Sequence, residues 1–106
     1  MNSDRVRRLG RAGWKVGTVA EFLHLEPAEA AYIELKVRLA VELEARRQKL
    51  RLSQKKVAER LRSSQSRVAK MEAADPSVSL DLLVRSLLAL GAEPGSVQQL
   101  IEKTLP

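Results

Sequence analysis

The sequence predicts an all-α fold, and three observations support this: its composition, its helix-capping residues and a long run of good helix formers. Apolar residues make up 44% of the chain and are mostly Leu, Val and Ala, whereas aromatic residues make up only 3%. Most of the charged and polar residues are Glu, Lys and Arg, which favour helices more than strands. At 106 residues, the chain is long enough for one domain with a buried core.

The first 36 residues predict two segments. Residues 1–17 contain three glycines and five basic residues without periodicity, so we expect a flexible basic arm. Residues 18–36 are expected to form an N-terminal helical extension. The capping box from Thr18 to Glu21 predicts a short helix over residues 19–24, and Pro27 is well placed to open the next helix.

The segment from Ile33 to Ala45 alternates apolar and polar residues, and alternation alone predicts a β-strand. A strand of this length would be unusual, since strands have about 5–6 residues. The polar positions hold mainly Glu and Arg or Lys, and the apolar residues also form rows at helical spacing. We therefore predict one helix from Pro27 to about Leu50.

Serine residues mark the starts of further helices. Ser53 precedes a predicted helix over residues 54–61, and Ser64 precedes one over residues 65–73. Ser79 precedes a helix over residues 80–90 that Gly91 would end. A capping box that begins at Ser96 predicts a last helix. The apolar side of this last helix, with Val97, Leu100 and Ile101, is a candidate dimer contact. An apolar face of the long helix is the other candidate.

The helices over residues 54–61 and 65–73 can cross at a steep angle, because Ala58 provides a small contact between them. The second helix would then project from the surface with a polar outer side, whose amide and cationic groups can pair with base edges in the DNA major groove. Helix amino ends suit phosphate oxygens. The candidate DNA-binding residues are Gln54, Ser64, Gln65, Ser66, Arg67 and Lys70. The alternative is an ordinary solvated helix face.

The distribution of charge along the sequence supports DNA as the binding partner. Residues 47–72 hold nine basic and two acidic side chains, a net charge of +7, and residues 1–16 carry a net +4. Residues 17–46 carry −3 and residues 73–106 carry −2. The most basic block thus coincides with the two crossing helices, where nucleic-acid phosphates would lie.

Other classes of protein are excluded or disfavoured. The chain has no cysteine and one histidine, His24, so we expect no disulfide, no metal and no cofactor. We expect no enzymatic activity, since no serine has a positioned histidine, no glycine-rich phosphate loop is present and the acidic residues alternate at expected surface positions. No apolar run suits a signal peptide or a membrane span, so we expect a cytoplasmic protein.

The patterns Leu-Ser-Gln…Val-Ala…Leu, Ser-Gln-Ser…Val…Met-Glu and Leu-Leu-Val…Leu-Leu…Leu-Gly resemble the Xre/Cro family of helix-turn-helix proteins over about residues 41–90. The resemblance implies a lambda-repressor-like five-helix bundle, with residues 37–106 as the helix-turn-helix DNA-binding domain. It also implies an ion pair between Arg47 and Glu72. Arg62 and Ala74 stand where the family has glycine, and a left-handed residue there costs about 1 kcal/mol, so we expect a reshaped turn.

A narrower resemblance, from Trp14 onward, is to HigA-type antitoxins. It rests on Val-Gly-Thr-Val-Ala-Glu-Phe-Leu, a Glu-rich helix and Ser-Ser-Gln-Ser-Arg-Val-Ala-Lys-Met-Glu. It implies a homodimer that represses its own operon at a palindromic operator and neutralises a RelE-like or HigB-like ribonuclease toxin. The alternatives are a repressor without a toxin, and a protein-interaction or membrane-surface module.

The aromatic residues Trp14, Phe22 and Tyr32 all precede the predicted DNA-binding unit. Because aromatic residues and arginine dominate binding hot spots, these three are possible toxin-binding residues. The alternative is that Phe22 and Tyr32 pack the short helix onto the long one.

Overall fold

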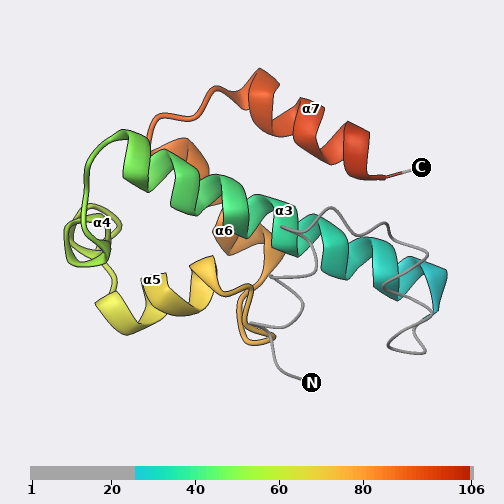
Figure 1. Cartoon of the computed structure of the whole chain (residues 1–106), viewed down its shortest axis with the longest axis horizontal. Helices are drawn as coiled ribbons and strands as arrows, with labels where there is room; N and C mark the ends of the chain where they lie inside the picture. The colour runs from blue at the N-terminus through green and yellow to red at the C-terminus, as the bar shows by residue number, and fades with distance from the viewer. Residues whose placement is uncertain (1–25, 106) are drawn as a thin grey trace.

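The computed structural model describes residues 26–105, in which helices follow one another without a strand. They are α3 (Pro27–Lys49), α4 (Gln54–Arg60), α5 (Gln65–Glu72), α6 (Leu80–Ala89) and α7 (Pro94–Thr104). The long helix α3 runs across the molecule, with α5 and α7 on opposite sides of it (Figure 1). The all-α prediction is confirmed for this part of the chain. The predicted arm over residues 1–17 and the short helix over residues 19–24 lie outside the described residues.

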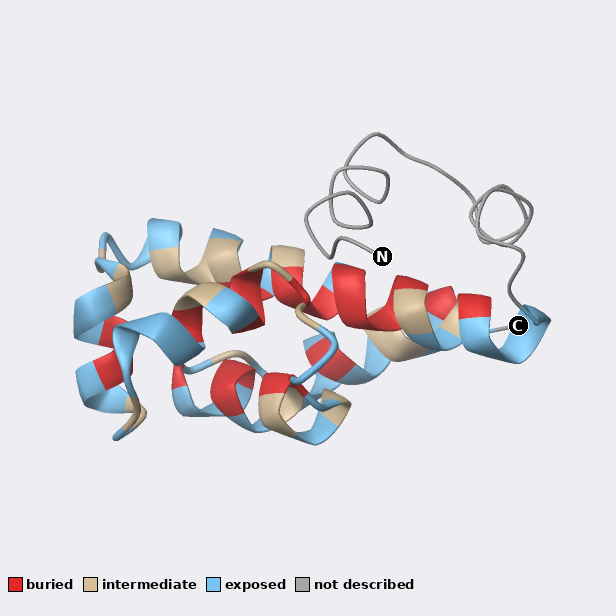
Figure 2. Cartoon of the chain, turned by 90° about the horizontal axis from the view of Figure 1, so that it is seen from below, coloured by how far each residue is buried: buried red, intermediate tan, exposed pale blue. Residues whose placement is uncertain are grey.

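The alternating segment is helical throughout, as predicted, and the strand interpretation is wrong. Leu35, Leu39 and Leu43 are buried along α3, which contacts α5, α6 and α7. Figure 2 shows that buried positions recur along much of this helix. The expectation that acidic residues stay at the surface is wrong for Glu34, which is buried, and basic Lys36 on the same helix is buried as well. A helix turns by 100° per residue, so neighbouring positions do not alternate between inside and outside as they do in a strand.

The core is formed by aliphatic side chains from every helix that the structure describes. The most deeply buried large residues are Leu39, Leu43, Met71, Leu83, Leu87, Val37, Val57 and Val68. Buried Ser86 on α6 donates a hydrogen bond from its hydroxyl to the sulfur of Met71 on α5, at 3.5 Å. The burial of this many aliphatic groups is the main favourable contribution to folding, and it holds α5 against α6 and α3.

The serine caps predicted for α4, α5 and α6 are confirmed. The hydroxyl oxygens of Ser53, Ser64 and Ser79 each accept a hydrogen bond from the backbone N–H three residues later, at 3.1 Å. These bonds satisfy one of the free N–H groups at each helix start, which contributes about 0.5–2 kcal/mol per cap.

The last helix begins earlier than predicted. Pro94, not Ser96, opens α7, with Glu93 as its N-cap and no side-chain cap. Proline suits the first helical position because its φ angle is already helical and it has no N–H to leave unpaired. Of the three apolar residues expected at a dimer contact, Val97 is buried in the core, whereas Leu100 and Ile101 are half-buried.

Helices α3 to α6 end in the same way. In each, the residue after the C-cap has a positive φ angle, and its N–H and the next N–H return to carbonyls of the last turn. This is the Schellman arrangement. The left-handed residues are Arg51, Arg62, Ala74 and Gly91, with φ angles of 57°, 54°, 53° and 88°. The expectation of a reshaped turn at Arg62 is therefore wrong: the turn keeps a glycine-like backbone without glycine.

Replacing Arg62 by glycine is expected to stabilise the protein. The left-handed conformation costs a residue with a side chain about 1–2 kcal/mol, and glycine loses about 0.5–1 kcal/mol more entropy on folding. The midpoints of these ranges leave a net gain of about 0.7 kcal/mol. Thermal unfolding followed by circular dichroism measures the change. The matched control is Arg85→Gly at an exposed position inside α6, which is expected to lose about 1 kcal/mol. A lower melting temperature for Arg62→Gly would contradict this account of the turn.

Candidate nucleic-acid interface

The two short helices α4 and α5 pack against each other, and α5 presents two chemically different sides. Val68, Met71 and Glu72 are buried at helical spacing on its inner side. The predicted contact residues on the other side are exposed, namely Gln65, Ser66, Arg67 and Lys70. An exposed helix edge of amide, hydroxyl and cationic groups has the donors and acceptors that read base edges in a major groove.

Ser64 lies at the amino end of this edge and caps α5. Its hydroxyl oxygen accepts the N–H of Arg67 at 3.1 Å. Because the oxygen acts as the acceptor, the hydroxyl proton remains available to donate to an outside group such as a phosphate oxygen. The same residue can therefore start the helix and contact a ligand at its positive end.

A charged network behind this edge fixes α5 to α3. Arg47 Nε donates to Glu72 Oε2 at 2.6 Å, and Arg47 Nη2 donates to Glu72 Oε1 at 3.1 Å. Arg47 Nη1 also donates to the carbonyl of Leu52 at 3.0 Å, in the loop before α4. The Glu72 side chain is 4% exposed and that of Arg47 is 17% exposed. A two-point bond of this kind fixes direction as well as distance.

Gln54 belongs to the same network. Its side-chain nitrogen donates to Glu72 Oε1 at 3.2 Å, so the first residue of α4 is joined to the last residue of α5. Sequence reasoning had assigned Gln54 to DNA alone and missed this bond. One amide hydrogen and the amide oxygen of Gln54 remain free for an outside partner.

Lys36 supports the segment that follows α5. Its ammonium donates to the backbone carbonyl of Asp75 at 3.1 Å. Burial lowers the pKa of Lys36, and the nearby Asp75 carboxylate partly opposes this shift. The hydroxyl and N–H of Ser77 both bond to Asp75 Oδ1, at 2.7 and 2.9 Å, and lower the pKa of that carboxyl. The chain leaving α5 is therefore held from α3 and by its own turn.

Two hollows border the exposed edge of α5 formed by Gln65, Ser66, Arg67 and Lys70, which we call the recognition edge. One, of about 320 Å³, is lined by Ser64, Ser66, Arg67, Lys70, Ser77 and Val78. The other, of about 360 Å³, lies between the α4–α5 turn, α5 and α6, and includes Arg60, Arg62, Arg67 and Arg85. Arg67 borders both. Sequence reasoning missed Arg60, Arg62, Arg85 and Ser77 as part of this surface. Arg85 comes to this edge only because α6 packs beside α5.

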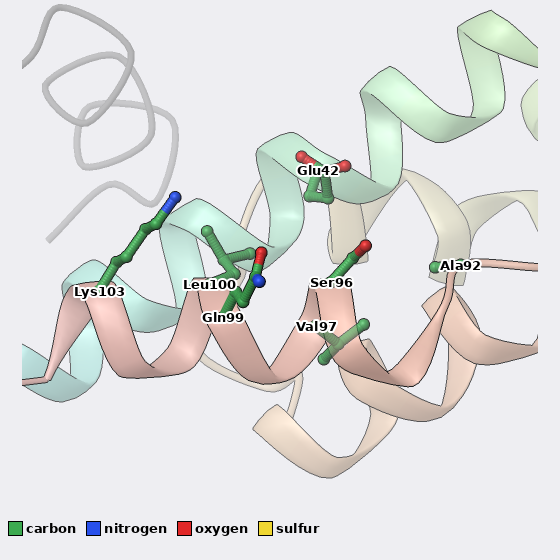
Figure 3. Close-up of a pocket in the computed structure, with 7 residues that line it drawn as sticks. All are labelled: Glu42, Ala92, Ser96, Val97, Gln99, Leu100 and Lys103. Carbon is green, nitrogen blue, oxygen red and sulfur yellow. The ribbon is translucent and has the colours of Figure 1, made fainter.

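A third hollow lies on the other side of α3, between α3 and α7, and has a volume of about 160 Å³. Figure 3 shows Glu42 on α3 and Ser96, Gln99 and Lys103 on α7 around it. It contains one acidic and one basic residue, so it lacks the cationic character of the hollows beside α5. Among residues 26–105, no group of three or more potential metal ligands is found, and no helix has the length and apolarity to cross a membrane.

Tyr32 lies far along the chain from the recognition edge, on the first half of α3. Its side chain is 45% exposed, and the ammonium of Lys36 lies 5.8 Å from the centre of its ring. The other two aromatic candidates, Trp14 and Phe22, lie outside the described residues. The packing of the short helix onto the long one through Phe22 and Tyr32 therefore stays a prediction.

Two short helices joined by a tight turn, with the second held by a buried ion pair and exposing a polar edge, define a helix-turn-helix DNA-binding domain. The chain belongs to a family of helix-turn-helix domains, whose model matches residues 38–100. The match begins within α3 and includes α4, α5 and α6 completely. No curated protein and no solved structure matches the chain.

Removing the carboxylate of Glu72 is expected to destabilise the domain strongly. In Glu72→Ala, Arg47 would keep a largely buried charge without its partner, which costs on the order of 3–5 kcal/mol. Urea unfolding measures the loss. The control is Glu59→Ala, whose carboxylate pairs with Lys56 at 3.4 Å on an exposed surface and contributes only about 0–1 kcal/mol. Equal losses in the two variants would show that the Arg47–Glu72 pair does not hold the helices.

Proposed function

We propose that this protein is a sequence-specific DNA-binding regulator that inserts α5 into the major groove. The observation that carries the proposal is the exposed edge of α5, where Gln65, Arg67 and Lys70 project from a helix that is fixed from behind. Gln can pair with adenine, and Arg or Lys with guanine. The basic residues around this edge would supply the phosphate contacts that bring the helix to DNA.

The proposed regulator acts as a homodimer on a palindromic operator. Helix-turn-helix dimers place their recognition helices about 34–36 Å apart, so each half of the site has the same sequence in opposite orientation. An accessible apolar surface supports a second copy as partner: Val84 and exposed Leu88 on α6 border a hollow with Ile101 on α7. None of these residues belongs to the recognition edge, so dimerisation there would leave the edge free.

Replacing Gln65, Arg67 and Lys70 together by alanine is expected to abolish specific DNA binding without unfolding the protein, because all three side chains are exposed. The probe is a duplex that the wild-type protein selects from a random pool. Since specific binding exceeds non-specific binding by about 10³-fold or more, a titration should show at least a hundredfold loss.

The control replaces Gln99 and Lys103 on α7, across α3 from the recognition helix (Figure 1). This variant is expected to bind the selected duplex like the wild type. Unchanged binding by the triple variant would contradict the proposal and favour a module that contacts protein or a membrane surface instead.

In its finer form, the proposal is an Xre-family antitoxin of the HigA type, which neutralises a RelE/HigB-like toxin and autorepresses its operon. The sequence resemblance from Trp14 onward supports it. So does the first part of α3, which precedes the matched residues 38–100 and exposes Tyr32. The alternative is a repressor without a toxin. Such a repressor would not need a protein-binding surface at this end of the chain.

Deleting residues 1–16, which include Trp14, is expected to weaken toxin binding more than operator binding, because the proposed toxin contacts precede the DNA-binding unit. The toxin candidate is the small basic protein encoded beside this gene, co-expressed with a tag. Co-purification and gel-shift titration of the full chain and the truncated chain measure the two affinities. A larger loss of operator binding would instead make residues 1–16 a DNA-binding extension, and a neighbour that does not co-purify would favour the repressor alone.

A further inference from the structure

A cluster of arginines outside the predicted recognition residues lies beside α5. Arg60 comes from the last turn of α4, Arg62 from the turn before α5 and Arg85 from α6. With Arg67 they surround one hollow of about 360 Å³. The rest of its lining is uncharged and includes Leu61, Ser63, Met71, Leu82, Ser86 and Ala89.

The side chains of these arginines make few interactions within the described part of the protein. Among residues 26–105, the side chains of Arg60, Arg62 and Arg67 make neither an ion pair nor a hydrogen bond, and Arg85 has one exposed contact of 3.5 Å with Asp81. No acidic residue lines the hollow. All four side chains are exposed, so their guanidinium groups are accessible to an outside anion, which would also relieve the repulsion between them.

The position of the hollow favours a DNA phosphate as the anion. Arg67 borders this hollow and also the one lined by Ser66 and Lys70, so the arginine hollow lies directly beside the base-reading edge of α5. A helix in the major groove, which is about 12 Å wide, has a sugar–phosphate strand on either side. The arginine hollow lies at the side of α5 toward α6, so its guanidinium groups would meet one of these strands when α5 lies in the groove.

We propose that Arg60, Arg62 and Arg85 form a phosphate-binding site for the DNA backbone, next to the base-reading residues of α5. The inference rests on the proposed DNA-binding function and adds to it. Guanidinium groups bind phosphate oxygens through two parallel hydrogen bonds, which fixes orientation as well as affinity. Such contacts set the register of α5 in the groove and carry no sequence information directly.

The test is the salt dependence of binding to the selected duplex. Each phosphate contact that is lost reduces the slope of log affinity against log salt concentration by about 0.9. Arg60→Gln, Arg62→Gln and Arg85→Gln are each expected to reduce it by that amount, and the triple variant by about 2.7 in total. The preference for the selected duplex over a random one is expected to stay within twofold of wild type.

Two controls distinguish the effect of losing this site from the effect of losing positive charge in general. Lys103→Gln on α7 removes one positive charge away from the hollow and is expected to leave the slope unchanged. Replacing the three arginines by lysine keeps the charge but not the paired hydrogen bonds, and is expected to keep the slope while weakening affinity. Circular dichroism of each variant shows that it is folded.

Several outcomes would overturn the inference. An unchanged slope in the triple glutamine variant would mean that the hollow does not meet the backbone. A lost preference for the selected duplex would mean that these arginines read bases. Inorganic phosphate could also stabilise the wild type but not the triple glutamine variant. If the salt-dependence slope of that variant is unchanged as well, the hollow binds a free anion and not the DNA backbone. If the wild type itself selects no duplex, the proposed function fails, and that result is distinct from all of these.

Discussion

The position of the recognition helix depends on one interaction, the two-point bond between Arg47 and Glu72. It joins the end of α3 to the last residue of α5 across 25 positions of sequence, and Arg47 also holds the loop before α4 through Leu52. α5 has only eight residues, and a helix this short is not stable alone in water. Its direction is therefore set by tertiary contacts, and among these the buried pair is the one that fixes an angle.

The remaining contacts of α5 also hold this helix in position, from other sides. Val68 and Met71 fill the space against the core, and Ser86 bonds to Met71 from α6. Lys36 holds the chain just after α5 by binding the carbonyl of Asp75. With its inner side fixed in this way, α5 can present hydrophilic side chains outward without their taking part in packing. Under the proposed function, this separation of roles would let the outer residues vary with the DNA sequence to be read while the fold is kept.

Features that depend on neighbouring residues could be predicted from the sequence. Ser53, Ser64 and Ser79 cap helices by bonding three residues ahead, so the sequence alone locates them. The start of α7 was missed because two local signals compete there, and Pro94 opens the helix two residues before the capping box at Ser96. The buried Glu34 and Lys36 were missed because alternating polarity in a helix does not separate inside from outside.

Features that depend on tertiary packing were predicted less well. The outer residues of α5 follow from helical spacing, but their use in DNA binding comes from the resemblance to helix-turn-helix proteins. The bond from Gln54 to Glu72 joins residues 18 positions apart, and Arg85 reaches the interface only because α6 packs beside α5. The spacing of residues in the sequence indicates neither this bond nor the position of Arg85. The left-handed Arg51, Arg62 and Ala74 likewise show that a helix end can take a glycine conformation without glycine when the Schellman bonds hold it.

The most direct test of the central claim is methylation protection of the selected duplex by dimethyl sulfate, which modifies guanine N7 in the major groove and adenine N3 in the minor groove. If α5 occupies the major groove, bound protein should protect guanine N7 at matching positions of both half-sites. Protection confined to adenine N3, or no protection at saturating protein, would contradict it.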